Sequence, residues 1–149
     1  MLRSFEIHPA STVEEATELL ARFGEAAAPY AGGTELLLVM KRGLLHYRHL
    51  VDVKTIGSLR RLEVDRERGA LRVGATVTHR QLELSELVQR YIPAVSQVER
   101  RVANVRVRSM GTLAGNLCFA VPHSDLATLL QALGARVHLE GAGGRRRWV

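Results

Sequence analysis

Residues Ser109–Cys118 read SMGTLAGNLC, and this small-residue stretch decides which fold the sequence predicts. It holds two glycines and an alanine within five residues, with the hydroxyl of Thr112 and the amide of Asn116 among them. Glycine destabilises regular helices and strands, so such a cluster usually marks unusual backbone or backbone that another group approaches closely. We predict an irregular loop whose uncovered N–H groups can donate to phosphate oxygens, and a tight loop packed against another strand is the alternative.

A second small-residue stretch, Tyr30–Leu37, reads YAGGTELL and follows a short extended segment. It opens a predicted helix, and the first N–H groups of a helix have no internal partner while the helix dipole favours negative charge. The order of strand, glycine pair, hydroxyl and helix is therefore an arrangement that binds anions. The lysine of a Walker A loop and the third glycine of GxGxxG are both missing. Two such loops in one small domain predict a ligand that carries two phosphates.

Together these stretches resemble the FAD-binding domain of the flavoprotein subunit of molybdenum hydroxylases, the xanthine dehydrogenase and carbon monoxide dehydrogenase family. Residues 31–37 match the first FAD loop of that family, and residues 108–116 match the second, followed by PHSDL at 122–126. The segment 73–79 fits as well, and the similarity extends from about Phe5 to Val149. The resemblance implies an α+β, two-lobed domain of the PCMH type, with a small N-terminal α/β lobe, a larger α+β lobe and the cofactor in the cleft between them. We expect the lobes at residues 1–55 and 56–149.

The resemblance also implies which residues bind FAD. In the first loop, Gly32 and Gly33 would let backbone N–H groups reach the pyrophosphate, and Thr34 would add a hydroxyl donor. Glu35 is a carboxylate close to phosphate, so its side chain must point away or cap backbone. The cofactor-binding residues expected here are Ala31, Gly32, Gly33, Thr34, Glu35 and Leu36.

The second loop would contact the cofactor from the other side, with polar contacts from its hydroxyl and amide side chains. Asp125 matches an aspartate that in the family accepts hydrogen bonds from the cofactor's sugar hydroxyls, although a role as helix N-cap is equally open. Ala114 stands where the family usually has glycine. The residues expected here are Gly111, Thr112, Ala114, Gly115, Asn116 and Asp125. We expect no catalytic side chain and no metal ligand.

The function that the resemblance implies is that of an FAD-dependent oxidoreductase subunit. It would relay electrons from iron–sulfur clusters in partner subunits through FAD to an acceptor, beside a molybdopterin-containing large subunit and an iron–sulfur small subunit. The alternatives are a truncated or remnant FAD-fold module without independent catalysis, or a different PCMH-type flavin oxidoreductase. Family members continue past the position of Val149 with a part that covers the flavin ring. We therefore expect the isolated chain to hold FAD weakly and to be inactive.

Composition limits the classes of protein and the kinds of partner that the sequence allows. A hydrophobic content of 46% with 24% charged residues is typical of a globular protein. No apolar run approaches the roughly 18 residues that span a bilayer, and the N-terminus lacks a signal-peptide core, which favours the cytoplasm. The single cysteine excludes an internal disulfide and a four-thiolate cluster, and the histidines show no metal-ligand spacing. The net charge of +6 would suit nucleic acid, but the arginines are scattered and no recognition motif is present, so we expect no nucleic-acid partner.

Hydrophobic periodicity and capping residues predict the secondary structure. Strands are expected at 5–7, 28–31, 49–53, 113–117 and 136–140, with a hairpin at 62–65 and 70–73. Helices are expected at 13–23, 35–42, 85–91 and 125–133, with a short helix capped by Thr78 and another that begins at Pro93. Capping boxes are expected at Thr12 with Glu15 and at Thr78 with Gln81.

Overall fold

The computed structural model describes residues 2–149, which form two compact units. Unit 1 comprises Met1–Gly57 and Ala135–Val149, and unit 2 comprises Ser58–Gly134. The sequence placed residues 135–149 in the second lobe, whereas the structure groups them with the first. The reason is packing, because these residues lie against the first helix of the chain.

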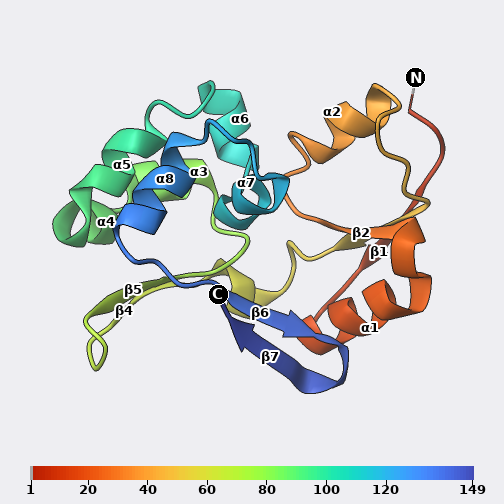
Figure 1. Ribbon diagram of the computed structural model, residues 1–149, viewed down its shortest axis with the longest axis horizontal. Helices are drawn as coiled ribbons and strands as arrows, with labels where there is room; N and C mark the ends of the chain where they lie inside the picture. Colours follow the sequence, from red (N-terminus) through yellow and green to blue (C-terminus); the bar gives the residue numbers. More distant parts are fainter. Residues whose placement is uncertain (1) are drawn as a thin grey trace. The chain divides into compact units, whose positions relative to one another are not determined.

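Unit 1 is built on a three-stranded parallel sheet with the order β1-β3-β2. Figure 1 labels its two outer strands, β1 and β2. Its strands are β1 (Glu6–Pro9), β2 (Ala27–Tyr30) and β3 (His49–Asp52). Helices α1 (Val13–Phe23) and α2 (Leu36–Lys41) alternate with the strands, and a 3₁₀ turn, η1 (Gly24–Ala26), leads into β2. The predicted order of strand, helix, strand, helix and strand is therefore confirmed.

The centre of unit 1 is strand β3, whose Leu50 and Val51 are fully buried. Leu50 packs with Ala28 and Met40 from the neighbouring strand and from α2. The unit is completed by a C-terminal hairpin of β6 (His138–Gly141) and β7 (Arg145–Trp148), joined by η3 (Ala142–Gly144). This hairpin packs against α1, which explains its place in unit 1.

Unit 2 combines a hairpin with a group of short helices. After η2 (Gly57–Arg60), the antiparallel strands β4 (Leu62–Asp65) and β5 (Ala70–Val73) confirm the predicted hairpin. The helices are α3 (His79–Leu84), α4 (Glu86–Tyr91), α5 (Pro93–Glu99), α6 (Val105–Met110), α7 (Leu113–Phe119) and α8 (Asp125–Ala132). They enclose a core of Val77, Leu82, Val88 and Val95. Thr78 caps α3 through the predicted capping box with Gln81.

The prediction of an irregular loop followed by a strand at residues 113–117 is wrong. Helix α6 ends at Met110 and α7 begins at Leu113, so the glycine stretch is a short break between two helices. Thr112 caps α7 because its Oγ1 accepts a hydrogen bond from the N–H of Gly115 at 3.1 Å. The periodicity of a short apolar run does not distinguish a strand from a helix, and here the N-cap at Thr112 favours the helix.

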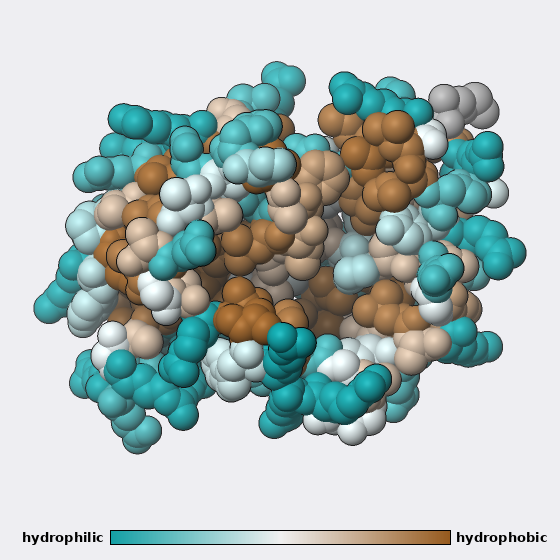
Figure 2. All heavy atoms as spheres, viewed as in Figure 1, coloured by the Kyte–Doolittle hydropathy of each residue, from teal (hydrophilic) through white to brown (hydrophobic). Residues whose placement is uncertain are grey.

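The surface carries both polar and apolar areas. In the view of Figure 2, hydrophobic side chains gather over α2 and the segment after it, where Leu38, Leu44 and Leu45 are exposed. Among the described residues, no helix combines the length and the apolar character needed to cross a membrane.

Candidate cofactor-binding loops

The first glycine loop connects the end of β2 at Tyr30 to the start of α2 at Leu36. Gly33 has a φ of +68°, in the left-handed region that side chains disfavour. A Cβ at this position would lie 2.6 Å from Cε2 of the Tyr30 ring and 3.2 Å from Cδ1 of Leu37. The ring is in turn held by the ammonium of Lys54, which lies 3.8 Å from its centroid. Backbone conformation and packing therefore both require glycine at position 33.

The backbone N–H groups of this loop are unpaired. Within the part of the chain that the structure describes, the N–H groups of residues 32–36 donate to no other group. The carbonyl of Gly33 accepts the N–H of Leu37 at 3.1 Å, so helical bonding starts only beyond them. Glu35 occupies the N-cap position without a side-chain cap and is exposed. Consecutive free donors at a helix start suit an anion, so these residues fit the pyrophosphate of FAD.

The second loop is bonded differently, because its N–H groups are largely used inside unit 2. The N–H of Leu113 donates to the carbonyl of Val77 at 3.0 Å, and the N–H of His79 donates to the carbonyl of Gly111 at 3.0 Å. Thr112 forms an isolated antiparallel bridge with Thr78. Of the first four N–H groups of α7, only that of Ala114 lacks a partner among the described residues.

Glycine is required at position 115 by the cap itself. A Cβ there would lie 2.9 Å from the Oγ1 of Thr112, which holds the N–H of Gly115. Thr112 is buried, with 4% of its surface exposed, and its carbonyl accepts the N–H of Asn116 at 3.0 Å. The clearance that the sequence assigned to Gly115 thus serves the loop's own hydrogen bonds.

Ser124 is the N-cap of α8, and not Asp125. The Oγ of Ser124 accepts the N–H of Ala127 at 3.3 Å and donates to the Oδ1 of Asn116 at 3.0 Å. Asp125 is the first helical residue and is exposed, and its carboxylate has no partner among residues 2–149. Of the two roles that the sequence left open for Asp125, capping is therefore excluded.

Asn116 and Asp125 line a hollow of about 270 Å³ within unit 2. The same hollow is lined by Arg101 and His123, which sequence reasoning did not select. Arg101 lies just after α5. The spacing of the arginines along the chain does not indicate a binding site, so only the structure shows that Arg101 lines this hollow. The arrangement offers amide, carboxylate and guanidinium groups for hydrogen bonds to a polar ligand.

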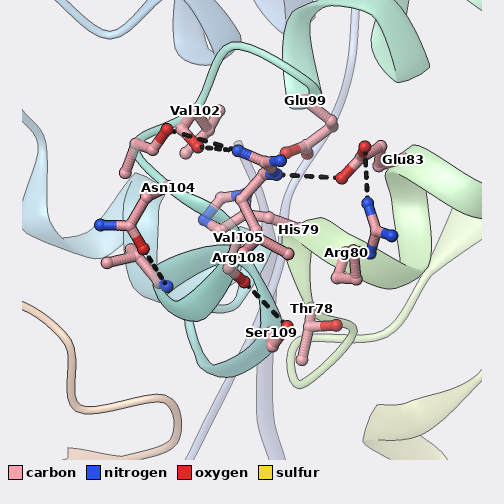
Figure 3. Close-up of polar contacts among 12 residues, drawn as sticks. Thr78, His79, Arg80, Glu83, Glu99, Val102, Asn104, Val105, Arg108 and Ser109 are labelled. Carbon is pink, nitrogen blue, oxygen red and sulfur yellow. Dashed lines mark hydrogen bonds and ion pairs between the residues drawn. The ribbon is translucent and has the colours of Figure 1, made fainter.

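An ion network anchors α6, the helix that enters the second loop (Figure 3). Arg108 donates from Nε to the Oε2 of Glu83 at 2.9 Å, and from Nη1 to the carbonyls of Val102 at 3.0 Å and Ala103 at 3.3 Å. Arg80 pairs with the Oε1 of Glu83 at 2.7 Å. The hydrogen bond from Arg80, followed by that from Arg108, outweighs burial and lowers the pKa of the Glu83 carboxyl.

A second buried pair lies beside this network. The Nδ1 of His79 is 2.7 Å from the Oε2 of Glu99, and both side chains are buried (Figure 3). The other oxygen of Glu99, Oε1, is buried with no partner among the described residues. His79 also donates its N–H to Gly111, so this pair and the glycine loop are directly connected.

The comparisons with known proteins agree with the resemblance to FAD-binding domains. The chain matches the family described as FAD binding domain in molybdopterin dehydrogenase over residues 3–149. It is 35% identical over 143 residues to the carbon monoxide dehydrogenase medium chain of Afipia carboxidovorans, covering 96% of this chain and 49% of that protein. It is 32% identical over 139 residues to the xanthine dehydrogenase FAD-binding subunit of Escherichia coli O157:H7, covering 93% and 47%. A solved structure of Cu,Mo-CO dehydrogenase matches with a TM-score of 0.94 and 33% identity, covering 100% of this chain and 51% of that one.

This chain belongs to the family of FAD-binding domains of molybdopterin dehydrogenases. The resemblance inferred from the two glycine loops is confirmed, as is the α+β fold class. FAD, the cofactor predicted from them, is the one that the family description names. The chain spans about half the length of the curated relatives it matches.

Proposed function

We propose that this chain is the FAD-binding part of the flavoprotein subunit of a molybdenum-containing hydroxylase or dehydrogenase. The observation that carries the proposal is the row of unpaired N–H groups at residues 32–36, in a chain that belongs to an FAD-binding family. Its closely similar relatives are named as medium chains or FAD-binding subunits of dehydrogenases. These names and the family description support a partner that carries molybdopterin.

In this proposal the first loop binds the pyrophosphate. Gly32 and Gly33 bring bare backbone N–H groups to the phosphate oxygens, and Thr34 adds its hydroxyl, which has no partner among the described residues. The N–H groups of Glu35 and Leu36 extend the same row. The exposed Glu35 carboxylate turns to solvent, which reduces its repulsion of the phosphates.

The second loop contributes contacts of a different kind. Asp125 accepts hydrogen bonds from sugar hydroxyls, because its carboxylate is exposed and is not needed as a cap. Asn116 presents its amide NH₂, since Ser124 already donates to its Oδ1. Among the described residues at the start of α7, the backbone N–H of Ala114 is the donor left for the cofactor, and Gly111, Thr112 and Gly115 would line the site beside it.

When bound, FAD supplies the redox chemistry, and the chain binds and orients it. No catalytic side chain is needed for this role. Electrons would come from iron–sulfur clusters of a small subunit, after substrate oxidation in a molybdopterin-containing large subunit, and would leave to an acceptor. We place this complex in the cytoplasm.

The test compares FAD with FMN by calorimetry on the purified chain. FAD should bind more tightly, because FMN has only one phosphate for the first loop and lacks the second sugar. FMN binding that equals or exceeds FAD binding would contradict the proposal. The partner class is tested separately, by measuring molybdenum and iron in material that copurifies with the chain expressed in its own cell.

A further inference from the structure

Three side chains that could bind a metal ion lie together in unit 1, away from both glycine loops in the sequence. Glu6 and His8 belong to β1, and His49 belongs to β3 (β1 and the neighbouring α1 are labelled in Figure 1). Alternate residues of a strand share a face, and His49 is the register partner of Glu6 on the adjacent parallel strand. The three side chains therefore meet on one face of the sheet, although His8 and His49 are 41 residues apart in the chain.

The distances among the three ligand atoms match those around a metal ion. The Nε2 of His8 is 3.0 Å from the Nδ1 of His49, and the Oε2 of Glu6 is 3.7 Å from each of these nitrogens. A point equidistant from three atoms with these separations lies about 2.0 Å from each, and Zn²⁺ binds imidazole nitrogen and carboxylate oxygen at roughly 2.0–2.2 Å.

Hydrogen bonding alone accounts for this cluster less well. Two imidazole nitrogens at 3.0 Å form one hydrogen bond, in which one ring donates and the other accepts. The carboxylate of Glu6, at 3.7 Å from both, is beyond hydrogen-bond distance and gains nothing from that bond. A cation at the common centre would instead lie within coordination distance of all three ligand atoms.

The surroundings hold the imidazole rings in place. The ring of Phe23, on α1, stacks on His49 with centroids 4.0 Å apart and lies 4.7 Å from the ring of His8. The side chains of His8 and His49 are 23% and 19% exposed, and that of Glu6 is 73% exposed, so the cluster stays open to solvent on one side. An aromatic wall on one side and water on the other is suited to an ion that keeps some water ligands.

We propose that Glu6, His8 and His49 form a binding site for a divalent transition-metal ion such as Zn²⁺, with the remaining coordination positions taken by water. Imidazole and carboxylate ligands suit zinc and its first-row neighbours, and not the softer ions that select thiolates. The ion connects the edge strand β1 to the central strand β3. It therefore stabilises unit 1, because the unfolded chain cannot hold the three ligands together.

The experiment is a calorimetric titration of the FAD-free chain with zinc chloride, in a Cys118→Ser background. The exposed thiol of Cys118 is removed because it binds zinc by itself. One equivalent of zinc should bind, and His8→Gln or His49→Gln should each weaken the affinity at least tenfold. Glu6→Gln should weaken it several-fold. Zinc affinity that is unchanged in both histidine variants would overturn the proposal, as would the absence of binding to the parent chain.

The matched control is His138→Gln. His138 lies in the same unit, with its Nδ1 3.4 Å from the Oε1 of Glu140, but this pair lacks a second imidazole. Zinc affinity should be unchanged in this variant, and a loss equal to that of His8→Gln would overturn the proposal. If a histidine variant does not fold, judged by circular dichroism in EDTA, zinc X-ray absorption of the parent decides instead. The spectrum should show scattering from two imidazoles, and its absence would again overturn the proposal.

Discussion

The two glycine loops have similar sequences but use their backbone donors in opposite ways. In the first loop the N–H groups of residues 32–36 are all unpaired among the described residues. In the second, three of the first four N–H groups of α7 already donate within unit 2. A glycine-rich stretch before a helix is therefore not by itself a phosphate-binding site, because its backbone N–H donors must also lack partners within the protein.

The difference comes from the residue at the N-cap. In the second loop Thr112 takes this position in an extended conformation, with φ −111° and ψ 154°, and its hydroxyl caps the helix. In the first loop Glu35 takes it in a helical conformation, with φ −102° and ψ −46°, and makes no cap. Thr34 stands one residue earlier and its hydroxyl remains available. The same glycine–threonine pair thus leaves donors free in one loop and satisfies them in the other.

The largest effect is expected from Gly33→Val. A branched side chain would clash with the ring of Tyr30 and would strain a backbone at φ +68°. Moving the loop displaces the donors at 32–36, so FAD affinity should fall by about 2 kcal/mol, roughly thirtyfold. Calorimetry with FAD measures this change.

The control for this change is Gly43→Val, at the C-terminal end of α2. Gly43 also has a positive φ, +75°, but a Cβ there meets nothing within 4 Å. This variant should lose some stability through backbone strain while keeping FAD affinity. If both variants lose affinity equally, the comparison between the loops fails, because strain anywhere around α2 would then suffice.

Thr112→Ala should act mainly on stability. Removing an N-cap hydroxyl typically costs about 1 kcal/mol, and this one is buried. FAD affinity should fall less than in Gly33→Val, because the loop loses its shape but no free donors. Chemical denaturation and calorimetry on the same sample separate the two effects.

Thr12→Ala is the matched cap removal in unit 1. The Oγ1 of Thr12 accepts the N–H of Glu15 at 3.1 Å, as that of Thr112 accepts the N–H of Gly115. It should cost similar stability and leave FAD affinity unchanged. An equal loss of affinity in Thr12→Ala would mean that stability, and not the second loop, governs binding.

A smaller effect is expected from Asp125→Asn. The carboxylate has no partner among the described residues and Ser124 is the cap, so the unfolding free energy should stay unchanged. FAD affinity should fall about fivefold, near 1 kcal/mol, through loss of the charged acceptor. Ser124→Ala should instead lose stability through the cap, together with some FAD affinity because the Asn116 amide loses its partner. Lower stability in Asp125→Asn with unchanged affinity would contradict the assigned role.

Much of the secondary structure could be predicted because its signals are local. The Thr12 cap, the order of strands and helices from β1 to β3, and the hairpin at 62–65 and 70–73 in unit 2 each depend on patterns within a few residues. Both glycine loops could be selected for the same reason, and the family to which the chain belongs is one of FAD-binding domains.

The remaining features depend on contacts between distant residues. The run after Thr112 reads as strand or helix until its cap is seen, and Ser124 and Asp125 are equivalent as caps until one hydroxyl is placed. The packing of residues 135–149 on α1 carries no local signal. The meeting of His8 with His49 depends on strand register, so a search for histidine spacing along the chain cannot find it.

The smallest effect is expected from a fall in pH, which should loosen the second loop before the first. Arg80 and Arg108 lower the folded-state pKa of Glu83 below its ordinary value of 4.5. A carboxyl with a lowered folded pKa contributes stability that is fully present above its unfolded pKa and is lost as the pH falls through the folded pKa. As the pH falls below 4.5 and through the lowered folded pKa, protonation of Glu83 should therefore weaken its bond to Arg108 and loosen α6 and the second loop. Hydrogen exchange, corrected for intrinsic rates, should show protection lost at residues 105–116 before residues 31–41. Glu83→Gln should remove most of this pH dependence.

The control is Asp65→Asn, in the β4–β5 hairpin. A backbone hydrogen bond from Arg68, helped by contacts with Arg72, outweighs burial and lowers the pKa of the Asp65 carboxyl. Loss of this carboxylate should change the pH dependence of stability but not the order in which the loops open. If the first loop opens first, or if Asp65→Asn changes the order, the second loop does not depend on the Glu83–Arg108 pair.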